Sequence, residues 1–130
     1  MHSSKRVLVI EDSQPVGALL TDALEHEGCR AVLARTAAEG LHLAQALRPS
    51  VIAVDFAYAD QVVPVLRGSP ATCGIPIIAI SAPVRDVEPA LLGQLTRIFG
   101  EPFYPSDVVT AILEMLQVTA SNSAPPAARR

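Results

Sequence analysis

The feature that most constrains the fold is a short apolar run followed by a helix-forming segment, repeated five times along the chain. The third and fourth runs are almost continuously apolar, as in strands that are covered on both faces. Alternating strands and helices predict right-handed crossovers on a parallel sheet, with helices on both faces. The five runs are Arg6–Ile10, Ala31–Ala34, Val51–Val54, Ile75–Ile80 and Leu95–Phe99.

The segments between the runs carry signals that start and end helices. Ser13 is a good N-cap for a helix with apolar residues at helical spacing, and Gly28 is a natural stop for it. Thr36 and Glu39 form a capping-box pair for a helix over residues 37–47. The other predicted helices are a short one over 60–67, a weak one over 87–93, and a last one from Ser106 to about residue 118.

Composition favours one domain with one core. The chain has 130 residues, of which 50% are hydrophobic, and its formal net charge is -3. We expect a flexible N-terminus over 1–4, a folded domain over 5–118, and a disordered tail or linker stub over 119–130. The chain lacks a basic stripe and an apolar run of membrane-spanning length. We therefore expect a cytoplasmic protein that binds neither nucleic acid nor membrane directly.

Three carboxylates follow the ends of two predicted strands. Glu11 and Asp12 come after the first run, and Asp55 comes directly after the third. If these strands are neighbours, their carboxyl ends meet at one edge of the sheet and the carboxylates converge there. Converging carboxylates repel and desolvate one another, which favours a cation such as Mg²⁺ among them. Glu11 or Asp12 alone is better explained as helix capping, but the three together favour a metal and phosphoryl site.

The order of polar residues at the strand ends resembles the receiver domain of two-component response regulators. The acidic pair is followed by the lone Asp55, by Ser81 at the end of "CGIPIIAISA", and by "GEPF" at 100–103. The resemblance covers roughly residues 5–118. It implies a flavodoxin-like, doubly wound (βα)5 fold with a parallel five-stranded sheet in the order 2-1-3-4-5.

The resemblance also implies a phosphorylation switch. Asp55 would accept a phosphoryl group from a histidine kinase or phosphotransfer protein. Asp12, Asp55 and the backbone carbonyl of Ala57 would hold Mg²⁺, with Glu11 acting mainly through water, and Ser81 would donate a hydrogen bond to a phosphoryl oxygen. The domain would then signal by contact with a downstream protein partner, and a homodimer remains open.

The sequence departs from the family pattern in several places. Glu101 stands where the family has a lysine. A carboxylate at this position repels Asp55, whereas a lysine would attract it. Either phosphorylation is disfavoured, or Glu101 turns outward, is protonated or joins the metal shell. The segment "FAYADQVVP" lacks the "MPxxDG"-like stretch of the family, which predicts a shortened loop and third helix. Ile98 occupies the usual aromatic position, whereas Phe99 is expected to face the other way. We expect a cis peptide bond at Glu101–Pro102.

These departures leave two functions open. The leading hypothesis is a phosphorelay receiver that accepts a phosphoryl group on Asp55 with Mg²⁺. The alternative is a pseudo-receiver, a protein-binding module that works independently of phosphorylation. We expect no enzyme, because the sequence has no array of nucleophile and base beyond the acidic cluster. Arg85 and Arg97 are candidates for a cation near the site, and Tyr58 could cover either the acidic pocket or apolar surface.

Overall fold

The computed structural model describes residues 5–83 and 87–123, with 118–123 described by their backbone alone. Five strands form one parallel sheet in the order β2-β1-β3-β4-β5, which confirms the predicted doubly wound topology. The elements are β1 (Arg6–Ile10), α1 (Gln14–His26), β2 (Arg30–Ala34), α2 (Ala37–Leu47), β3 (Val51–Asp55), α3 (Phe56–Arg67), β4 (Ile77–Ala82), α4 (Pro89–Leu92), β5 (Arg97–Gly100) and α5 (Pro105–Ser123).

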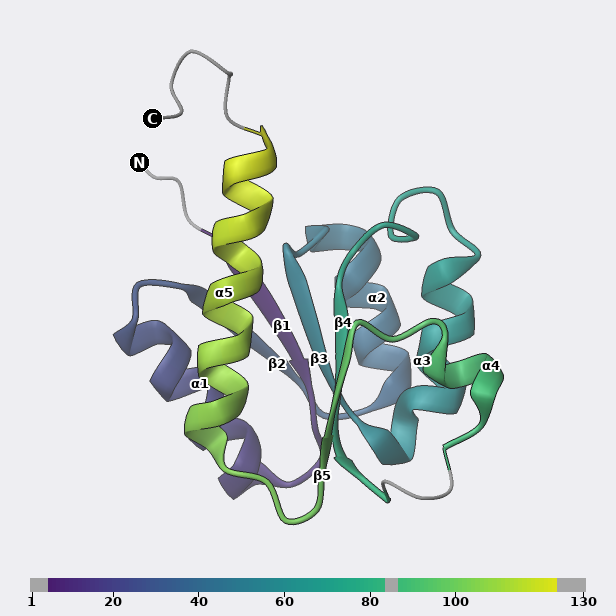
Figure 1. Ribbon diagram of the computed structural model, residues 1–130, viewed down its shortest axis with the longest axis horizontal. Coiled ribbons are helices and arrows are strands. Elements are labelled where there is room, and N and C mark those ends of the chain that lie inside the picture. Colours follow the sequence, from purple (N-terminus) through teal and green to yellow (C-terminus); the bar gives the residue numbers. More distant parts are fainter. Residues whose placement is uncertain (1–4, 84–86, 124–130) are drawn as a thin grey trace.

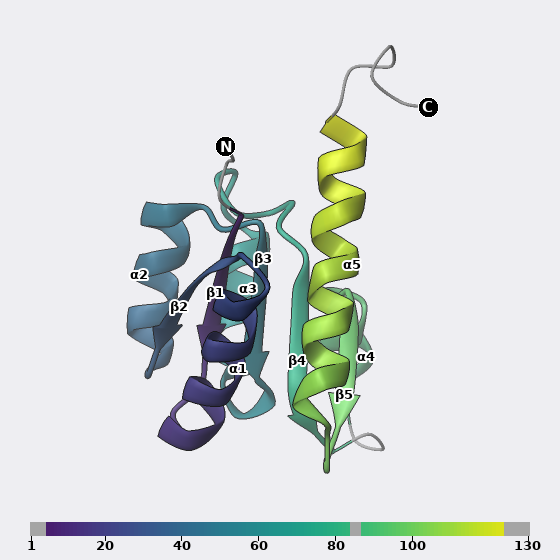
Figure 2. The same cartoon turned by 90° about the vertical axis from the view of Figure 1, so that its left-hand side faces the viewer.

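The molecule has three layers. Helices α1 and α5 cover one face of the sheet, and α2, α3 and α4 cover the other (Figures 1 and 2). Alternation along β1 divides the apolar side chains between two cores, because Val7 and Val9 pack beneath α1 and α5, whereas Leu8 and Ile10 pack beneath α2 and α3. All four side chains are fully buried. A strand covered on both faces is apolar at every position, as the sequence predicted.

Two glycines let helices lie close to the sheet beside the end of β1. A Cβ atom at Gly40 in α2 would lie 2.6 Å from Cδ1 of Ile10, and one at Gly17 in α1 would lie 2.7 Å from Cδ1 of Leu33. Any larger residue would push the helix or the strand away. These close contacts hold α1 and α2 against the strands beside the end of β1, which Glu11 directly follows.

The first two helices begin at their predicted caps. The Val16 N–H donates to Ser13 Oγ at 3.4 Å, and the Glu39 N–H donates to Thr36 Oγ1 at 3.0 Å. Gly28 follows α1 with a φ of 94°, as expected for a glycine stop.

The third helix differs from its prediction. α3 begins at Phe56 rather than at residue 60 and continues through Pro64 to Arg67. The predicted start of this helix at residue 60 is therefore wrong, and the loop before it is indeed short. Asp55 caps the helix directly. A proline inside a helix removes one backbone hydrogen bond and crowds the preceding turn, yet α3 continues on both sides of Pro64.

The last helix is also longer than predicted. α5 ends at Ser123, so it includes the first residues of the segment predicted as a tail. Figure 1 shows its final turns extending beyond the edge at which β1 begins. The predicted N-terminal segment 1–4 and residues 124–130 lie outside the described residues. In the part of the chain that the structure describes, no helix combines the length and apolar character needed to cross a membrane.

Candidate functional site: an acidic cluster at the carboxyl edge

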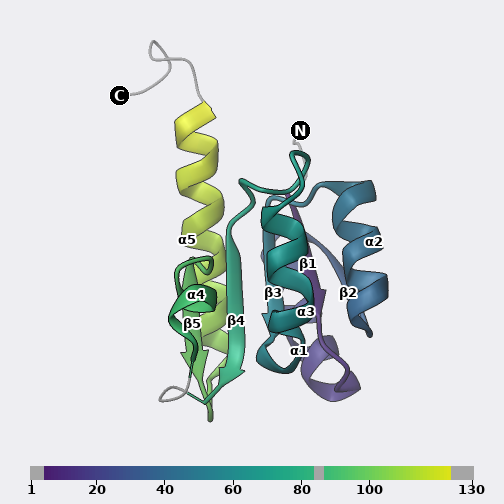
Figure 3. The same cartoon turned by 90° about the vertical axis from the view of Figure 1, so that its right-hand side faces the viewer.

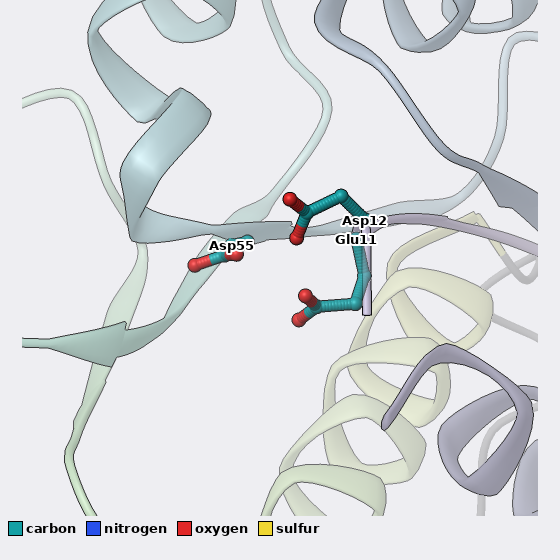
Figure 4. A group of neighbouring side chains, drawn as sticks. All are labelled: Glu11, Asp12 and Asp55. Atoms are coloured by element: carbon teal, nitrogen blue, oxygen red, sulfur yellow. The ribbon is translucent and has the colours of Figure 1, made fainter. Parts of the chain in front are cut away.

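The structure brings the three predicted carboxylates together. β1 and β3 are hydrogen-bonded neighbours with Ile10 in register with Val54, so the residues that follow them emerge at the same level. One carboxylate oxygen from each of Glu11, Asp12 and Asp55 lies within 4.8 Å of the others. Figure 4 shows the three side chains gathered beside the ends of the two strands.

The three carboxylates differ in their environments. Glu11 is only 3% exposed, and its Oε2 accepts a hydrogen bond from the Ser13 N–H at 3.1 Å. Asp12 is exposed and Asp55 is half-buried. The pKa of Glu11 is raised from 4.5 to about 7, mainly by burial and also by the neighbouring carboxylates Asp55 and Asp12, whereas the hydrogen bond from the Ser13 N–H lowers it. The cluster therefore holds negative charge at an energetic cost.

This donor set fits a hard divalent cation. Carboxylate oxygens are the ligands that Mg²⁺ prefers, and a cation would relieve the repulsion that raises the pKa of Glu11. Among the described residues, the groups that shift this pKa include no positive side chain. Asp12 and Asp55 would bind such an ion directly, with Glu11 behind them. The ion would supply positive charge to stabilise the oxygens of an incoming phosphoryl group.

Ala57, whose backbone carbonyl is predicted as a metal ligand, lies beside the acidic cluster in the first turn of α3. Its N–H donates to Oδ1 of Asp55 at 3.3 Å. Ala57 therefore holds the Asp55 carboxylate through its amide, and the role of its carbonyl stays a prediction.

Ser81 lies at the same edge of the sheet, in a strained backbone conformation. Asp55 is in register with Ile80, so Ser81 lies one residue beyond the level of Asp55. The pairing of β4 with β5 shifts between Ile80 and Ala82, and Ser81 between them has a φ of 63°. Non-glycine residues rarely adopt this left-handed conformation, and bulges of this kind redirect a side chain. The sequence contained no signal for this bulge.

Glu101 lies apart from the acidic cluster. It is exposed, its N–H donates to the Ala82 carbonyl at 3.1 Å, and it is outside the group of three carboxylates. Of the outcomes expected for this residue, the structure agrees with an outward orientation. The Glu101–Pro102 peptide bond is cis, as predicted.

Of the two arginines that are candidates for a nearby cation, Arg97 lies among the described residues. Arg97 begins β5, at the opposite edge of the sheet, and its guanidinium carbon lies 4.8 Å from the centre of the Phe99 ring. Phe99 packs on the side of the sheet that α5 covers. Arg85 lies outside the described residues.

Sequence reasoning overlooked Arg35, which lies at the rim of the cluster. Its guanidinium donates to the backbone carbonyl of Asp12 at 3.4 Å and to Oε1 of Gln14 at 2.7 Å. The signal was available, because Arg35 directly follows the apolar run that pairs with β1. It was missed because the arginines considered as a nearby cation, Arg85 and Arg97, lie near the fourth and fifth strands instead.

Tyr58 takes up both of the positions considered for it. It is half-buried against the core beneath α2 and α3. Burial, a hydrogen bond to Asp12 and the charges of the three carboxylates raise the pKa of the Tyr58 phenol. Its ring therefore covers apolar surface while its hydroxyl reaches the acidic cluster.

The fold was compared with known proteins. No protein-family model matches the chain, and no curated protein matches it. Solved structures do match, among them a putative response regulator from Chloroflexus aurantiacus, with 20% identity over 88% of this chain and 99% of that chain at a TM-score of 0.75. The chemotaxis response regulator CheY4 of Vibrio cholerae has 20% identity over 87% of this chain and 99% of that one, with a TM-score of 0.72.

A third match is a protein described as an atypical orphan response regulator with a phosphorylation-independent regulatory mechanism. It shares 19% identity with this chain over 86% of this chain and 95% of its own length, with a TM-score of 0.73. Identities this low establish the fold and leave the chemistry to be argued from the site. The chain has the fold of a response regulator receiver domain.

Proposed function

We propose that this chain is a receiver-type signalling module that acts by phosphorylation-independent protein contact, with an acidic cluster that binds a divalent cation. The observation that carries the proposal is the start of α3 at Phe56. Asp55 caps this helix, with the Ala57 N–H donating to its Oδ1 at 3.3 Å. One oxygen of the expected phosphoacceptor is thus already engaged in a hydrogen bond at the start of α3.

The charge at residue 101 supports the same conclusion. The family lysine would attract both the Asp55 carboxylate and a phosphoryl group, whereas Glu101 repels both. A unit pair about 4 Å apart contributes roughly 4 kcal/mol at an effective dielectric constant near 20. Because Glu101 is exposed, it avoids this repulsion by pointing away, but it supplies no compensating positive charge. The similarity to the atypical orphan regulator provides a precedent for such a mechanism on this fold.

Phosphoryl acceptance by Asp55 is the second candidate, favoured by the convergence of the three carboxylates. An Asp55 oxygen would attack the phosphorus of a phosphohistidine on a kinase or phosphotransfer protein, forming an acyl phosphate as the bond to histidine breaks. Ser81 would donate a hydrogen bond to a phosphoryl oxygen. In either role the domain would work in the cytoplasm and pass its signal to a protein partner.

Acetyl phosphate separates the two candidates. We expect the intact mass of the protein to stay unchanged after incubation with acetyl phosphate and Mg²⁺. We also expect the amide NMR spectrum recorded with Mg²⁺ to stay unchanged when beryllofluoride is added. A phosphoryl adduct that disappears in Asp55→Asn would instead establish the second candidate. The Glu101→Lys variant tests whether the charge at residue 101 prevents phosphorylation. A phosphoryl adduct that forms in this variant and not in the wild type would show that Glu101 prevents it.

Cation binding requires its own measurement. We expect Mn²⁺ to broaden amide resonances around Asp12 and Asp55, and Asp12→Asn to weaken this effect about tenfold. Glu114→Gln, which removes an exposed carboxylate from α5, serves as the matched control. Equal broadening in both variants would show that the cluster is not the binding site.

A further inference from the structure

A row of arginines lies at the amino edge of the sheet, opposite the carboxylates. Arg6 begins β1 and Arg30 begins β2, and the two are in register. Leu8 and Val32, two residues further along each strand, pack beneath α2 and α3, so both arginine side chains emerge on that face. Arg48 directly follows the last residue of α2. All three arginines are exposed, and we call them the arginine row.

Helix capping explains only one member of the arginine row. Arg6 Nη1 donates to the Leu47 carbonyl, at the end of α2, at 3.1 Å. A helix C-terminus carries about half a negative charge, so three guanidinium groups exceed it by about 2.5 charges. Neighbouring strands lie about 4.8 Å apart, which makes the in-register pairing of Arg6 with Arg30 unfavourable. Capping of the α2 C-terminus therefore explains Arg6 but does not explain Arg30 and Arg48.

The described residues around the arginine row supply little compensating charge. The single carboxylate of α2 is Glu39, in the first turn at the other end of the helix, and the connections over 48–50 and 68–76 contain none. Glu25 and Glu27 belong to the end of α1, which covers the opposite face. The Glu25 carboxylate already accepts a hydrogen bond from the Ala31 N–H at 2.7 Å. Figure 3 shows the face of the sheet that α2, α3 and α4 cover.

We propose that the arginine row binds an acidic segment of a partner protein, rich in Asp and Glu. Guanidinium groups match carboxylates in shape and charge and donate two parallel hydrogen bonds. Residues 1–4 and 119–130 contain no Asp or Glu, so these segments do not supply an acidic occupant. This inference gives the proposed protein contact a location, but it does not depend on Asp55.

Two other occupants fit the surface less well. Nucleic-acid affinity comes from neutralising many phosphates, and this surface offers three arginines on a protein with a net charge of -3. A second copy could bring its acidic cluster to the arginine row, but a contact between opposite edges is heterologous and leads to a ring or an open filament rather than to a dimer. An acidic peptide requires neither a large surface nor a closed symmetry.

Fluorescence anisotropy with a fluorescein-labelled octaglutamate peptide at low ionic strength tests this inference. We expect saturable binding that weakens about tenfold in Arg30→Glu. Arg48→Asn should weaken it as well, and asparagine tolerates the left-handed backbone at this position, where φ is 46°. Arg35→Glu is the matched control, because it removes an exposed arginine just past the other end of β2, and it should leave affinity within about twofold.

Each other outcome overturns the proposal. No binding by the wild-type protein, or equal loss in Arg30→Glu and Arg35→Glu, would mean that the arginine row is not a peptide site. Tighter binding of a labelled oligothymidylate than of octaglutamate would assign the surface to nucleic acid. Concentration-dependent assembly that disappears in Arg30→Glu, measured by sedimentation, would assign it to a second copy. Amide spectra of the variants establish that each remains folded.

Discussion

The two edges of the sheet treat charge in opposite ways. At the carboxyl edge, three carboxylates lie together, and the most buried of them, Glu11, has a pKa raised to about 7. Beside them, Ser81 has a left-handed backbone conformation. At the amino edge, the arginine side chains of the arginine row are exposed, whereas the Arg67 guanidinium donates hydrogen bonds to backbone carbonyls.

Arg67 shows how a charged side chain contributes to stability at the amino edge. Its Nε and Nη2 donate to the Gln94 carbonyl at 3.0 and 2.9 Å. Its Nη1 donates to the carbonyls of Cys73 at 2.9 Å and Ile75 at 2.7 Å. One guanidinium thus joins the end of α3 to the segments that lead into β4 and β5. Its burial lowers the pKa of Arg67, but its hydrogen bonds compensate for that burial.

Stabilising hydrogen bonds and clustered negative charge thus lie at opposite edges of the sheet. Hydrogen bonds at the amino edge hold three segments in place. At the carboxyl edge, carboxylates repel one another and the backbone at Ser81 is strained, and neither feature is needed for stability. The carboxyl edge is therefore expected to respond to ligands and pH, and the amino edge to govern unfolding.

The largest expected effect is at Arg67. Arg67→Met retains an apolar stem but leaves the carbonyls of Gln94, Cys73 and Ile75 without this partner. Because hydrogen bonds to charged groups contribute about 1.5–3 kcal/mol each and are not additive, we expect the free energy of unfolding to fall by roughly 3–5 kcal/mol. Urea denaturation measures it.

Arg30→Gln is the control for this prediction, since Arg30 is exposed at the same edge. We expect it to change the free energy of unfolding by no more than about 0.5 kcal/mol. A loss at Arg67 as small as that at Arg30 would remove the proposed distinction between the two edges.

The second effect is a pH dependence that arises at the carboxyl edge. The pKa of Glu11 rises from 4.5 to about 7 on folding, so the folded state binds the proton more tightly. Above pH 4.5 the unfolded chain loses this proton first, and stability falls until the folded pKa is passed, by at most about 3 kcal/mol. Denaturation across pH 4–8 measures this loss.

Two variants sharpen the pH prediction. Glu11→Gln should flatten the pH profile between 4.5 and 7, because glutamine does not titrate in this range. Glu39→Gln, at an exposed carboxylate in α2, should leave the slope as in the wild type. A slope that persists unchanged in Glu11→Gln would place the responsible group elsewhere.

The smallest effect concerns backbone strain at Ser81. Ser81→Gly removes the side chain from a residue whose φ is 63°, and we expect stability to rise by up to about 1 kcal/mol after the added flexibility of the unfolded chain is counted. Ser81→Ala should bring no such gain, because alanine keeps the Cβ. Thermal denaturation compares the two, and an equal response would show that the hydroxyl, rather than the backbone, sets the stability here.

Sequence reasoning succeeded where the signal was local or periodic. The caps at Ser13 and Thr36 and the buried β3 follow from single residues and from short patterns. It failed at α3, because Pro64 suggested an irregular helix and the capping role of Asp55 was masked by the role expected from the family. The Ser81 bulge and the Arg67 hydrogen bonds depend on partners far along the chain and carry no local signal.

The amino-acid sequence was enough to predict the alternation of strands and helices, and with it a parallel sheet that brings Glu11, Asp12 and Asp55 to one edge. Strands buried on both faces have a continuous apolar pattern, and this pattern can be recognised in the sequence. Only the tertiary structure decided that Asp55 caps a helix, that Glu101 lies apart, and that three arginines line up at the opposite edge. These features depend on where backbone groups of different segments meet, and that geometry exists only in the folded chain.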